Sequence, residues 1–465
     1  MIEAILPGTY VTVRDEGLIS VGGVASGNIG IVGTAAKGDV NVIKLLGSFE
    51  EAKIAFGERD DWQGGLQNEL TLLRALELIY NNGGRTVFAV RVAKKTLAKA
   101  IFSCKAGTTE LFRLEAKTPG TWGNEIQVKI TTEDSKTKLE LSRMTVRETY
   151  TLESGKLDQF NVTIASSKLV VLTKPLAATL TTLPGEVETT FESGKNGAEA
   201  GADEYKAGLA LLENETVNIV LLAGQTVGTK VTETWAGEAL DSHLRKTAEI
   251  KHERIGVIGS ALTNGSDDLD SIAAHQLNSD RLIYVTPGIQ VSGKTSIDTL
   301  PGAYTAAAVV GLMASLPVQT SPTNKVLAIG GLSTVFNSSQ LEKLVTQRVL
   351  AIQRRDGYRI VKGITTHDGA WRQVTTRRIV DYATYGVRSA CDPYIGKLNN
   401  ERVRGAMKAT IDGFLTRMVN DEALTGYTLV VNATRNQEIS GECMVTLTLQ
   451  PTFSIDFIKV TMYLS

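Results

Sequence analysis

Two strand-like stretches near the C-terminus, residues 442–450 and 454–464, most constrain how this chain folds. The first has the two-residue period of a half-buried strand, with apolar positions at Val445, Leu447 and Leu449. The second carries apolar residues in two phases, which a bulge near Ile458 reconciles: Ile455 and Phe457, then Val460, Met462 and Leu464. An apolar strand needs a sheet, so residues 454–464 must pair either with their own molecule or with a neighbouring one.

Length and composition indicate a multidomain protein of ordinary globular type. A chain of 465 residues exceeds one hydrophobic core, and 42% of its residues are hydrophobic. The apolar run 306–316 is about half a membrane span, and residues 1–10 lack the basic start of a signal peptide. We therefore expect a protein that is made in the cytoplasm, with no membrane insertion. The cysteines Cys104, Cys391 and Cys443 lie too far apart in sequence to suggest a disulfide framework.

The pattern of apolar residues predicts an α/β, multidomain (α+β) fold with a doubly wound, mostly parallel sheet at its core. Strands are expected at 86–92, 217–223, 255–259, 282–285 and 326–329. Helices are expected at 66–80, 203–213, 232–252, 267–278, 302–315, 341–355, 376–390 and 400–418. Between residues 101 and 200 the pattern becomes strand-rich, with strands expected at 111–116, 125–132, 138–151 and 162–172.

These patterns divide the chain into four parts. Residues 1–20 form an N-terminal arm whose short strand comprises Thr9, Tyr10, Val11, Thr12 and Val13. Residues 21–100 and 201–340 form the α/β core domain, and residues 101–200 form a β-rich outer insertion. Residues 341–465 form a C-terminal α+β domain that ends in an arm at 452–465.

Residues 288–295 (GIQVSGKT) match the P-loop pattern of nucleotide-binding proteins. A P-loop must open directly into a helix, whereas Pro301 and Gly302 soon follow here. In addition, none of the expected core strands ends in the acidic residue that would hold Mg²⁺ in a P-loop enzyme. Nucleotide binding through 288–295 therefore stands as the alternative function, and a Lys294→Ala variant tests it.

No other motif predicts chemistry. The four histidines lack zinc-ligand spacing, and the chain has no nucleophile elbow. The sequence therefore predicts no catalytic, cofactor or metal site, and no enzyme.

Charge gathers in residues 343–408, which hold fourteen Lys or Arg against five Asp or Glu, although the whole chain has a net charge of −1. A basic segment of this kind is typical of a surface that binds nucleic acid, of one that binds an acidic protein, or of one that only contacts solvent. The arginines lie on expected helices without interleaved aromatic residues, which favours an acidic protein partner over direct nucleic-acid binding.

Several segments resemble the contractile tail sheath proteins of phages, R-type bacteriocins and related injection systems. Their order and spacing carry the likeness: PGTYV (7–11), GIVGTAAKGDVN (30–41), NNGGRTVFAVRV (81–92), FESGKNGA (191–198), GITT (363–366) with Trp371, RRIVDYATYGVR (377–388), YIGKLNNERVR (394–404) and SIDFIKVTMYL (454–464). Residues 101–200 match poorly.

The resemblance implies a structural subunit that polymerises as a helical stack of rings, six-fold in symmetry, around an inner tail tube. It also implies baseplate and tail terminator proteins as partners, and a place in a virion tail or a released extracellular particle. In this family the terminal arms add strands to neighbouring subunits, which here assigns residues 9–13 and 454–464 as exchanged strands. Residues 442–450, with Val445, Leu447 and Leu449, are assigned as a receiving strand. Basic side chains of the inner domain face the tube, and the candidates are Arg354, Arg355, Arg377, Arg378, Arg402 and Arg404.

Overall fold

The computed structural model describes residues 25–62, 70–133, 136–153, 156–177, 183–197, 199–227, 234–261, 267–293 and 296–463. The chain forms two compact units. The large unit comprises residues 27–316 and 322–372, and the small unit comprises residues 1–26, 317–321 and 373–465. The expected domain boundary at 341 thus differs from the structure, which keeps residues 341–372 with the large unit because their strands join its main sheet.

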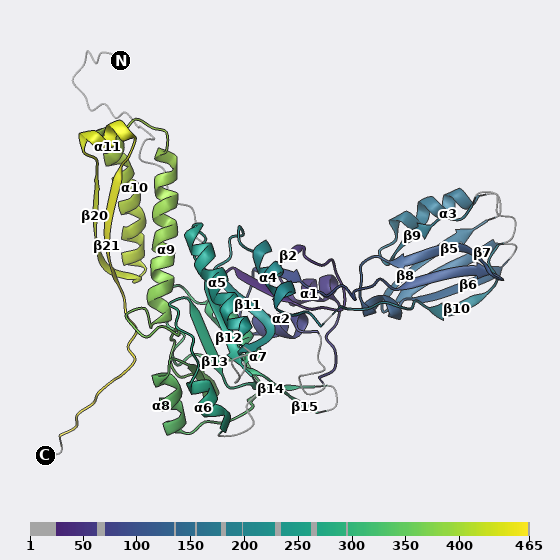
Figure 1. The fold of residues 1–465 in the computed structure, drawn as a ribbon, viewed down its shortest axis with the longest axis horizontal. Coiled ribbons are helices and arrows are strands. Elements are labelled where there is room, and N and C mark those ends of the chain that lie inside the picture. The colour runs from purple at the N-terminus through teal and green to yellow at the C-terminus, as the bar shows by residue number, and fades with distance from the viewer. Residues whose placement is uncertain are drawn as a thin grey trace, which may run out of the picture. The chain divides into compact units, whose positions relative to one another are not determined.

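Within the described residues, the large unit is built on a nine-stranded sheet with the order β16-β19-β18-β13-β12-β11-β1-β3-β2 (Figure 1). Its six central strands run parallel, and antiparallel strands close both edges. The strands are β1 (Ile29–Gly33), β2 (Ile43–Leu46), β3 (Val87–Arg91), β11 (Ile219–Val227), β12 (Ile255–Ser260), β13 (Leu282–Thr286), β16 (Val326–Leu327), β18 (Leu350–Arg354) and β19 (Tyr358–Ile360).

Helices cover both faces of this sheet, which is why β1, β12 and β13 are buried at every position and are mostly apolar. Helices α4 and α5 share one hydrophobic cluster with alternate side chains of the strands, while α7 packs on β11, β12 and β13 and against α2. The predicted doubly wound core is thereby confirmed. The helices are α1 (Phe49–Phe56), α2 (Leu72–Asn81), α4 (Ala202–Leu211), α5 (Trp235–Glu249), α6 (Asp267–Ala273), α7 (Gly302–Ser315) and α8 (Ser338–Thr346).

A small antiparallel sheet of β14 (Ile289–Ser292), β15 (Ile297–Leu300) and β17 (Gly331–Leu332) occupies the position of the P-loop-like motif. The motif's first residues form β14, and the chain then turns back into β15 instead of entering a helix. Lys294 and Thr295 lie outside the described residues. A β-hairpin does not direct a row of backbone N–H groups at a phosphate as a P-loop does, so the geometry is wrong for the alternative nucleotide-binding function.

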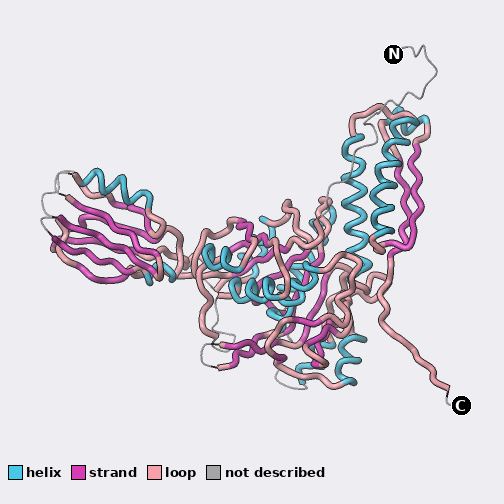
Figure 2. The backbone as a smooth tube through the Cα atoms, turned by 180° about the vertical axis from the view of Figure 1, so that it is seen from behind, coloured by secondary structure: helices cyan, strands magenta, loops and turns pink. Residues whose placement is uncertain are grey.

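The β-rich insertion is observed as two antiparallel sheets around one apolar core (Figure 2). Residues 162–172, expected as one strand, instead end a helix, pass through a 3₁₀ turn (Ile164–Ser166) and enter a strand only at Val170. The elements are β4 (Ile101–Ala106), β5 (Thr109–Ala116), a 3₁₀ helix (Thr121–Glu125), β6 (Gln127–Glu133), β7 (Lys136–Arg143), β8 (Val146–Leu152), α3 (Leu157–Thr163), β9 (Val170–Lys174) and β10 (Val187–Thr190).

Arg91, at the end of β3, joins the insertion to the main sheet. Its guanidinium is fully buried and donates hydrogen bonds to the carbonyl oxygens of Gly38 (2.6 Å), Pro119 (2.7 Å) and Asn196 (3.3 Å). Pro119 lies in the loop after β5 and Asn196 lies in the segment that leaves the insertion, so one side chain holds both against the loop after β1. Burial lowers the pKa of Arg91 to about 10, so the group stays charged at neutral pH.

The small unit is a pair of helices covered by a β-hairpin. Apolar residues of α9 (Val374–Cys391) and α10 (Glu401–Asn420) pack with the inner face of β20 (Leu424–Asn432) and β21 (Met444–Pro451). Gly386 allows the two helices to approach closely. A methyl group at this position would overlap the Phe414 ring. A 3₁₀ turn (Asp392–Tyr394) follows α9, and the short helix α11 (Arg435–Ser440) connects the two strands.

We predict that Arg91→Met destabilises the large unit by about 2–4 kcal/mol, because three buried carbonyl groups lose their donor. Urea denaturation followed by circular dichroism measures this. Arg85→Met, at an exposed arginine just before β3, is the matched control and should change stability by less than about 0.5 kcal/mol. Equal stability of the two variants would contradict the assigned role of Arg91.

Candidate functional site: the C-terminal hairpin

The hairpin of β20 and β21 is the candidate assembly site. The strands pair antiparallel, with Tyr427 opposite Leu449, Leu429 opposite Leu447 and Val431 opposite Val445. The predicted strand residues Val445, Leu447 and Leu449 are half-buried toward α9 and α10, and the alternate residues of β21 are exposed. Strand β20 was not predicted, although its TLVV run has strand-forming composition.

In the described part of the chain, β20 and β21 each have one strand partner, so the sheet has two open edges. Each open edge presents a row of backbone N–H and C=O groups in the geometry that a further strand requires. The edge of β21 extends over eight residues, and that of β20 over nine. The hairpin is therefore shaped to accept added strands.

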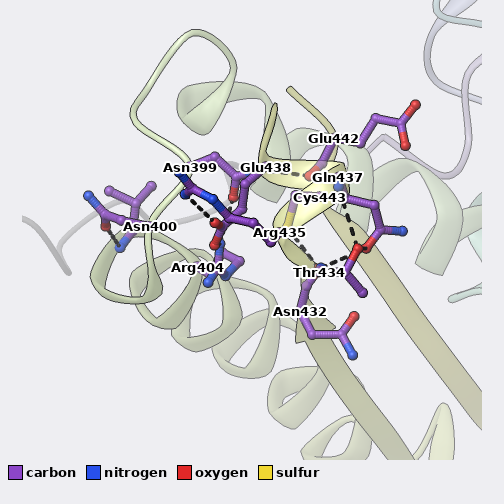
Figure 3. Close-up of polar contacts among 11 residues, drawn as sticks. Asn399, Asn400, Arg404, Asn432, Thr434, Arg435, Gln437, Glu438, Glu442 and Cys443 are labelled. Atoms are coloured by element: carbon purple, nitrogen blue, oxygen red, sulfur yellow. Dashed lines mark hydrogen bonds and ion pairs between the residues drawn. The ribbon is translucent and has the colours of Figure 1, made fainter. Parts of the chain in front are cut away.

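A polar network fixes the closed end of the hairpin (Figure 3). On α11, Glu438 accepts from Arg404 of α10 (2.9 Å) and from Arg435 (3.0 Å). Arg404 also donates to the Asn399 side chain (2.8 Å), whose amide donates to the carbonyl of Glu442 (2.7 Å). Helix α11 thus stays bound to the start of α10. The hydrogen bonds from Arg435 and then Arg404 hold the pKa of Glu438 below its usual range.

Local sequence explains why the chain turns here. Thr434 and Gln437 form a capping box at the start of α11. Gly441 ends the helix in the left-handed conformation (φ 75°), which costs glycine little. The Cys443 thiol then donates to the Asn432 carbonyl (3.6 Å), directly before the strands begin to pair.

Beyond Pro451 the chain leaves the hairpin. The Thr452 amide donates to the Ala423 carbonyl (3.1 Å), and residues 453–463 are assigned neither helix nor strand. The strand expected at 454–464 is thus absent from these described residues. Apolar side chains of this segment are between 64% and 91% exposed: Phe453, Ile455, Phe457, Ile458, Val460, Met462 and Tyr463. So much exposed apolar surface marks an interaction site.

The other arm residues of the prediction cannot be placed. Thr9, Tyr10, Val11, Thr12, Val13 and Leu464 lie outside the described residues.

Two of the six arginines expected to face a tube are instead buried inside the small unit, which corrects that expectation. Arg377, 8% exposed, pairs with Asp381 on the next turn of α9 (2.8 Å). Arg378, 5% exposed, donates to the carbonyls of Ser26 (3.2 Å) and Pro317 (3.5 Å). Burial lowers the pKa of Arg378 to about 10. Arg378 thus ties separate chain segments together, Arg377 forms an ion pair within its own helix, and both side chains are largely removed from solvent.

The other four arginines differ in solvent exposure and in their hydrogen bonds. Arg354 and Arg355 are exposed on the β18–β19 hairpin of the large unit, where Arg355 donates to the Asn324 side chain (2.9 Å). Arg402 is exposed on the first turn of α10, and Arg404 is held in the network with Glu438. Contact of Arg354, Arg355, Arg402 and Arg404 with a tube stays a prediction.

Within the described ranges, no group of three or more His, Cys, Asp or Glu side chains is placed to hold a metal ion. None of the described helices is both long and apolar enough to span a membrane.

Arg378→Glu is expected to destabilise the small unit by about 3–5 kcal/mol, because it removes the buried donor and buries an uncompensated carboxylate. Arg402→Glu, at an exposed position, should alter stability by less than about 1 kcal/mol. Urea denaturation of both variants measures the difference. A well-folded Arg378→Glu protein would show that Arg378 is not an internal tie.

Because the pKa of Glu438 is lowered, its contribution to stability is present above the unfolded pKa of glutamate, about 4.3, and is lost as pH falls through the lower folded pKa. We therefore expect wild type to exceed Glu438→Gln in urea midpoint at neutral pH, with the difference shrinking as the solution becomes acidic. Glu422→Gln, at an exposed carboxylate of the same unit, is the control. A pH-independent difference would exclude the ion pairs as its cause.

Comparison with known proteins finds a family model that matches the part of the chain containing the hairpin. Residues 366–465 match the family model described as the phage tail sheath C-terminal domain. A comparison with curated protein sequences finds no match.

Solved structures resemble nearly the whole chain. The sheath tail protein of Desulfitobacterium hafniense has a TM-score of 0.68 at 14% identity, covering 96% of this chain and 100% of its own. The sheath tail protein of Listeria innocua gives 0.64 at 14% identity, covering 94% and 97%. The helical sheath of the anti-feeding prophage in its contracted state gives 0.58 at 14% identity, covering 99% of both chains. The predicted resemblance to contractile tail sheath proteins is therefore confirmed, by the family model over residues 366–465 and by fold over nearly the whole chain.

Proposed function

We propose that this protein is the structural subunit of a contractile tail sheath, which polymerises helically around an inner tube and contracts to drive the tube through a target envelope. The carrying observation is that the segment matching the sheath family model, residues 366–465, holds an open-edged hairpin followed by an exposed apolar segment. A structural neighbour of the same fold is itself a helical sheath in its contracted state.

Subunits are linked by strand exchange. Residues 453–463 carry exposed apolar side chains in strand-like alternation, and the hairpin offers two open edges. Adding the C-terminal segment of one subunit to the hairpin of another satisfies the edge hydrogen bonds and buries this apolar surface. Residues 9–13 of a further subunit add to the remaining edge. One hairpin thereby connects three chains.

The stored free energy resides in the subunit interfaces, so contraction requires no nucleotide. A contact between different surfaces of two copies builds an open helical array when its rotation does not close. Each subunit then moves as a rigid body between two packings of that array, and the exchanged strands act as hinges that keep neighbours connected.

The proposed partners follow from the same account. They are further copies of this chain in six-fold rings, an inner tube protein, and baseplate and tail terminator proteins. Two baseplate structures of the anti-feeding prophage, one of them six-fold symmetrised, each contain a chain with a fold similar to that of this protein. Assembly takes place in the bacterial cytoplasm, and the particle acts after release. The exposed arginines Arg354, Arg355 and Arg402 are the basic side chains available to an acidic tube surface.

We predict that deleting residues 454–465 abolishes sheath formation and leaves the protein folded. The described deleted residues belong to no helix or strand, so the free energy of unfolding should change by less than about 1 kcal/mol. Urea denaturation tests folding, and negative-stain electron microscopy tests for striated cylinders.

The matched control replaces only polar residues of the same segment, Ser454→Ala with Thr461→Ala, and keeps the apolar side chains that strand exchange buries. This double variant should still assemble. Normal cylinders from the deletion variant would refute exchange through the C-terminal segment, and no cylinders from wild-type protein under any condition would refute the sheath function itself.

A further inference from the structure

Two of the three cysteines line one cavity of the small unit. Cys391 is the last residue of α9, and Cys443 directly precedes β21. Both are partly exposed and free, and both face a cavity of about 310 Å³ that Tyr394, Val403 and Met407 also line. Residues more than fifty positions apart are thus brought to the same hollow by the packing of the hairpin on the helices.

Neighbouring groups affect the ionisation of the Cys391 thiol. Burial raises the pKa of Cys391, and negative charge on Asp392 and on Cys443 raises it further. The hydrogen bond from the Cys443 thiol to the Asn432 carbonyl fixes Cys443 at the closed end of the hairpin.

Cations lie around the same cavity. Arg404 lines it while held by Asn399 and Glu438, and Lys397 lies over the Tyr394 ring with Nζ 5.0 Å from its centre. The thiolate is the form of cysteine that reacts with disulfides. The third cysteine lacks this setting, because Cys104 is 2% exposed in the apolar core of the insertion and burial raises its pKa to about 11.

We propose that Cys391 and Cys443 form a redox-active dithiol site, which a low-molecular-weight disulfide oxidises to one intramolecular disulfide bond. In the first step a protein thiolate attacks the small disulfide, forms a mixed disulfide and releases one small thiolate. In the second step the other protein thiolate attacks the protein sulfur of that mixed disulfide and releases the second small thiolate. The protein loses two protons and two electrons, and the small disulfide is reduced to two thiols.

The order of attack follows from the surroundings. Burial and the neighbouring Asp392 carboxylate raise the pKa of the Cys391 thiol and disfavour its thiolate, so we expect Cys443 to form the mixed disulfide and Cys391 to close the bond. The product ties the end of α9 to the start of β21 covalently. It therefore fixes the hairpin at the end where the network of Glu438 and Arg404 otherwise holds it, and it does so independently of pH.

The test uses the full-length, unassembled protein and oxidised glutathione as the probe. Intact mass spectrometry should show the loss of two hydrogen atoms, and non-reducing peptide mapping should join the peptides of Cys391 and Cys443. A reducing agent should reverse both changes. The oxidised protein should also unfold at a higher urea concentration than the reduced protein, because the bond restricts the unfolded chain.

Three variants sharpen the result. Cys391→Ser and Cys443→Ser should each be unable to form the bridge, and Cys391→Ser should stop at one bound glutathione. Cys104→Ser is the matched control and should behave like wild type. Wild-type protein that stays reduced, carries two glutathiones without a bridge, or forms only dimers through intermolecular disulfides would overturn the proposal. Because these readouts need no assembly, they are independent of the sheath function.

Discussion

Among the residues that the structure describes, one two-stranded sheet has two unfilled hydrogen-bonding edges, and the proposed assembly depends on them. An isolated two-stranded hairpin is only marginally stable in water, and here α9 and α10 support it from one face. Its edges still present backbone donors and acceptors, and the chain that leaves β21 displays apolar side chains in water. Both features are costly for a solitary molecule. In the proposed assembly both costs are removed together, because the exposed segment of one copy completes the sheet of another.

Buried arginines, by contrast, make each unit internally rigid. Arg91 binds three carbonyls at the base of the insertion, and Arg254 binds the carbonyls of Leu212, Glu213 and Glu215 at the end of α4. Arg378 does the same within the small unit. A guanidinium has five donors in a fixed plane, so it can join several chain segments at once. Rigid units linked by the proposed strand exchange suit a lattice that rearranges without unfolding its subunits.

Local pattern predicted much of this fold. The helix expected at 302–315 matches α7, and the parallel core strands lie where continuous apolar runs place them. Prediction failed where tertiary context decides. Residues 341–355 were expected as one helix, but α8 ends at Thr346, Arg348 adopts a left-handed conformation (φ 67°), and Leu350–Arg354 joins the sheet beside β13. The burial of Arg378 could not be predicted from local pattern either, because its acceptors at Pro317 and Ser26 are 61 and 352 positions away in the sequence.

The central claim is that the apolar C-terminal segment of one copy completes the hairpin sheet of another. A cryo-electron microscopy reconstruction of the polymerised protein, at a resolution that traces each chain, tests it most directly. The account predicts that residues 453–463 of a neighbouring subunit run along an open edge of β20 or β21 with continuous backbone hydrogen bonds. A reconstruction in which each subunit keeps this segment on its own body, with no foreign backbone beside the hairpin, would contradict it.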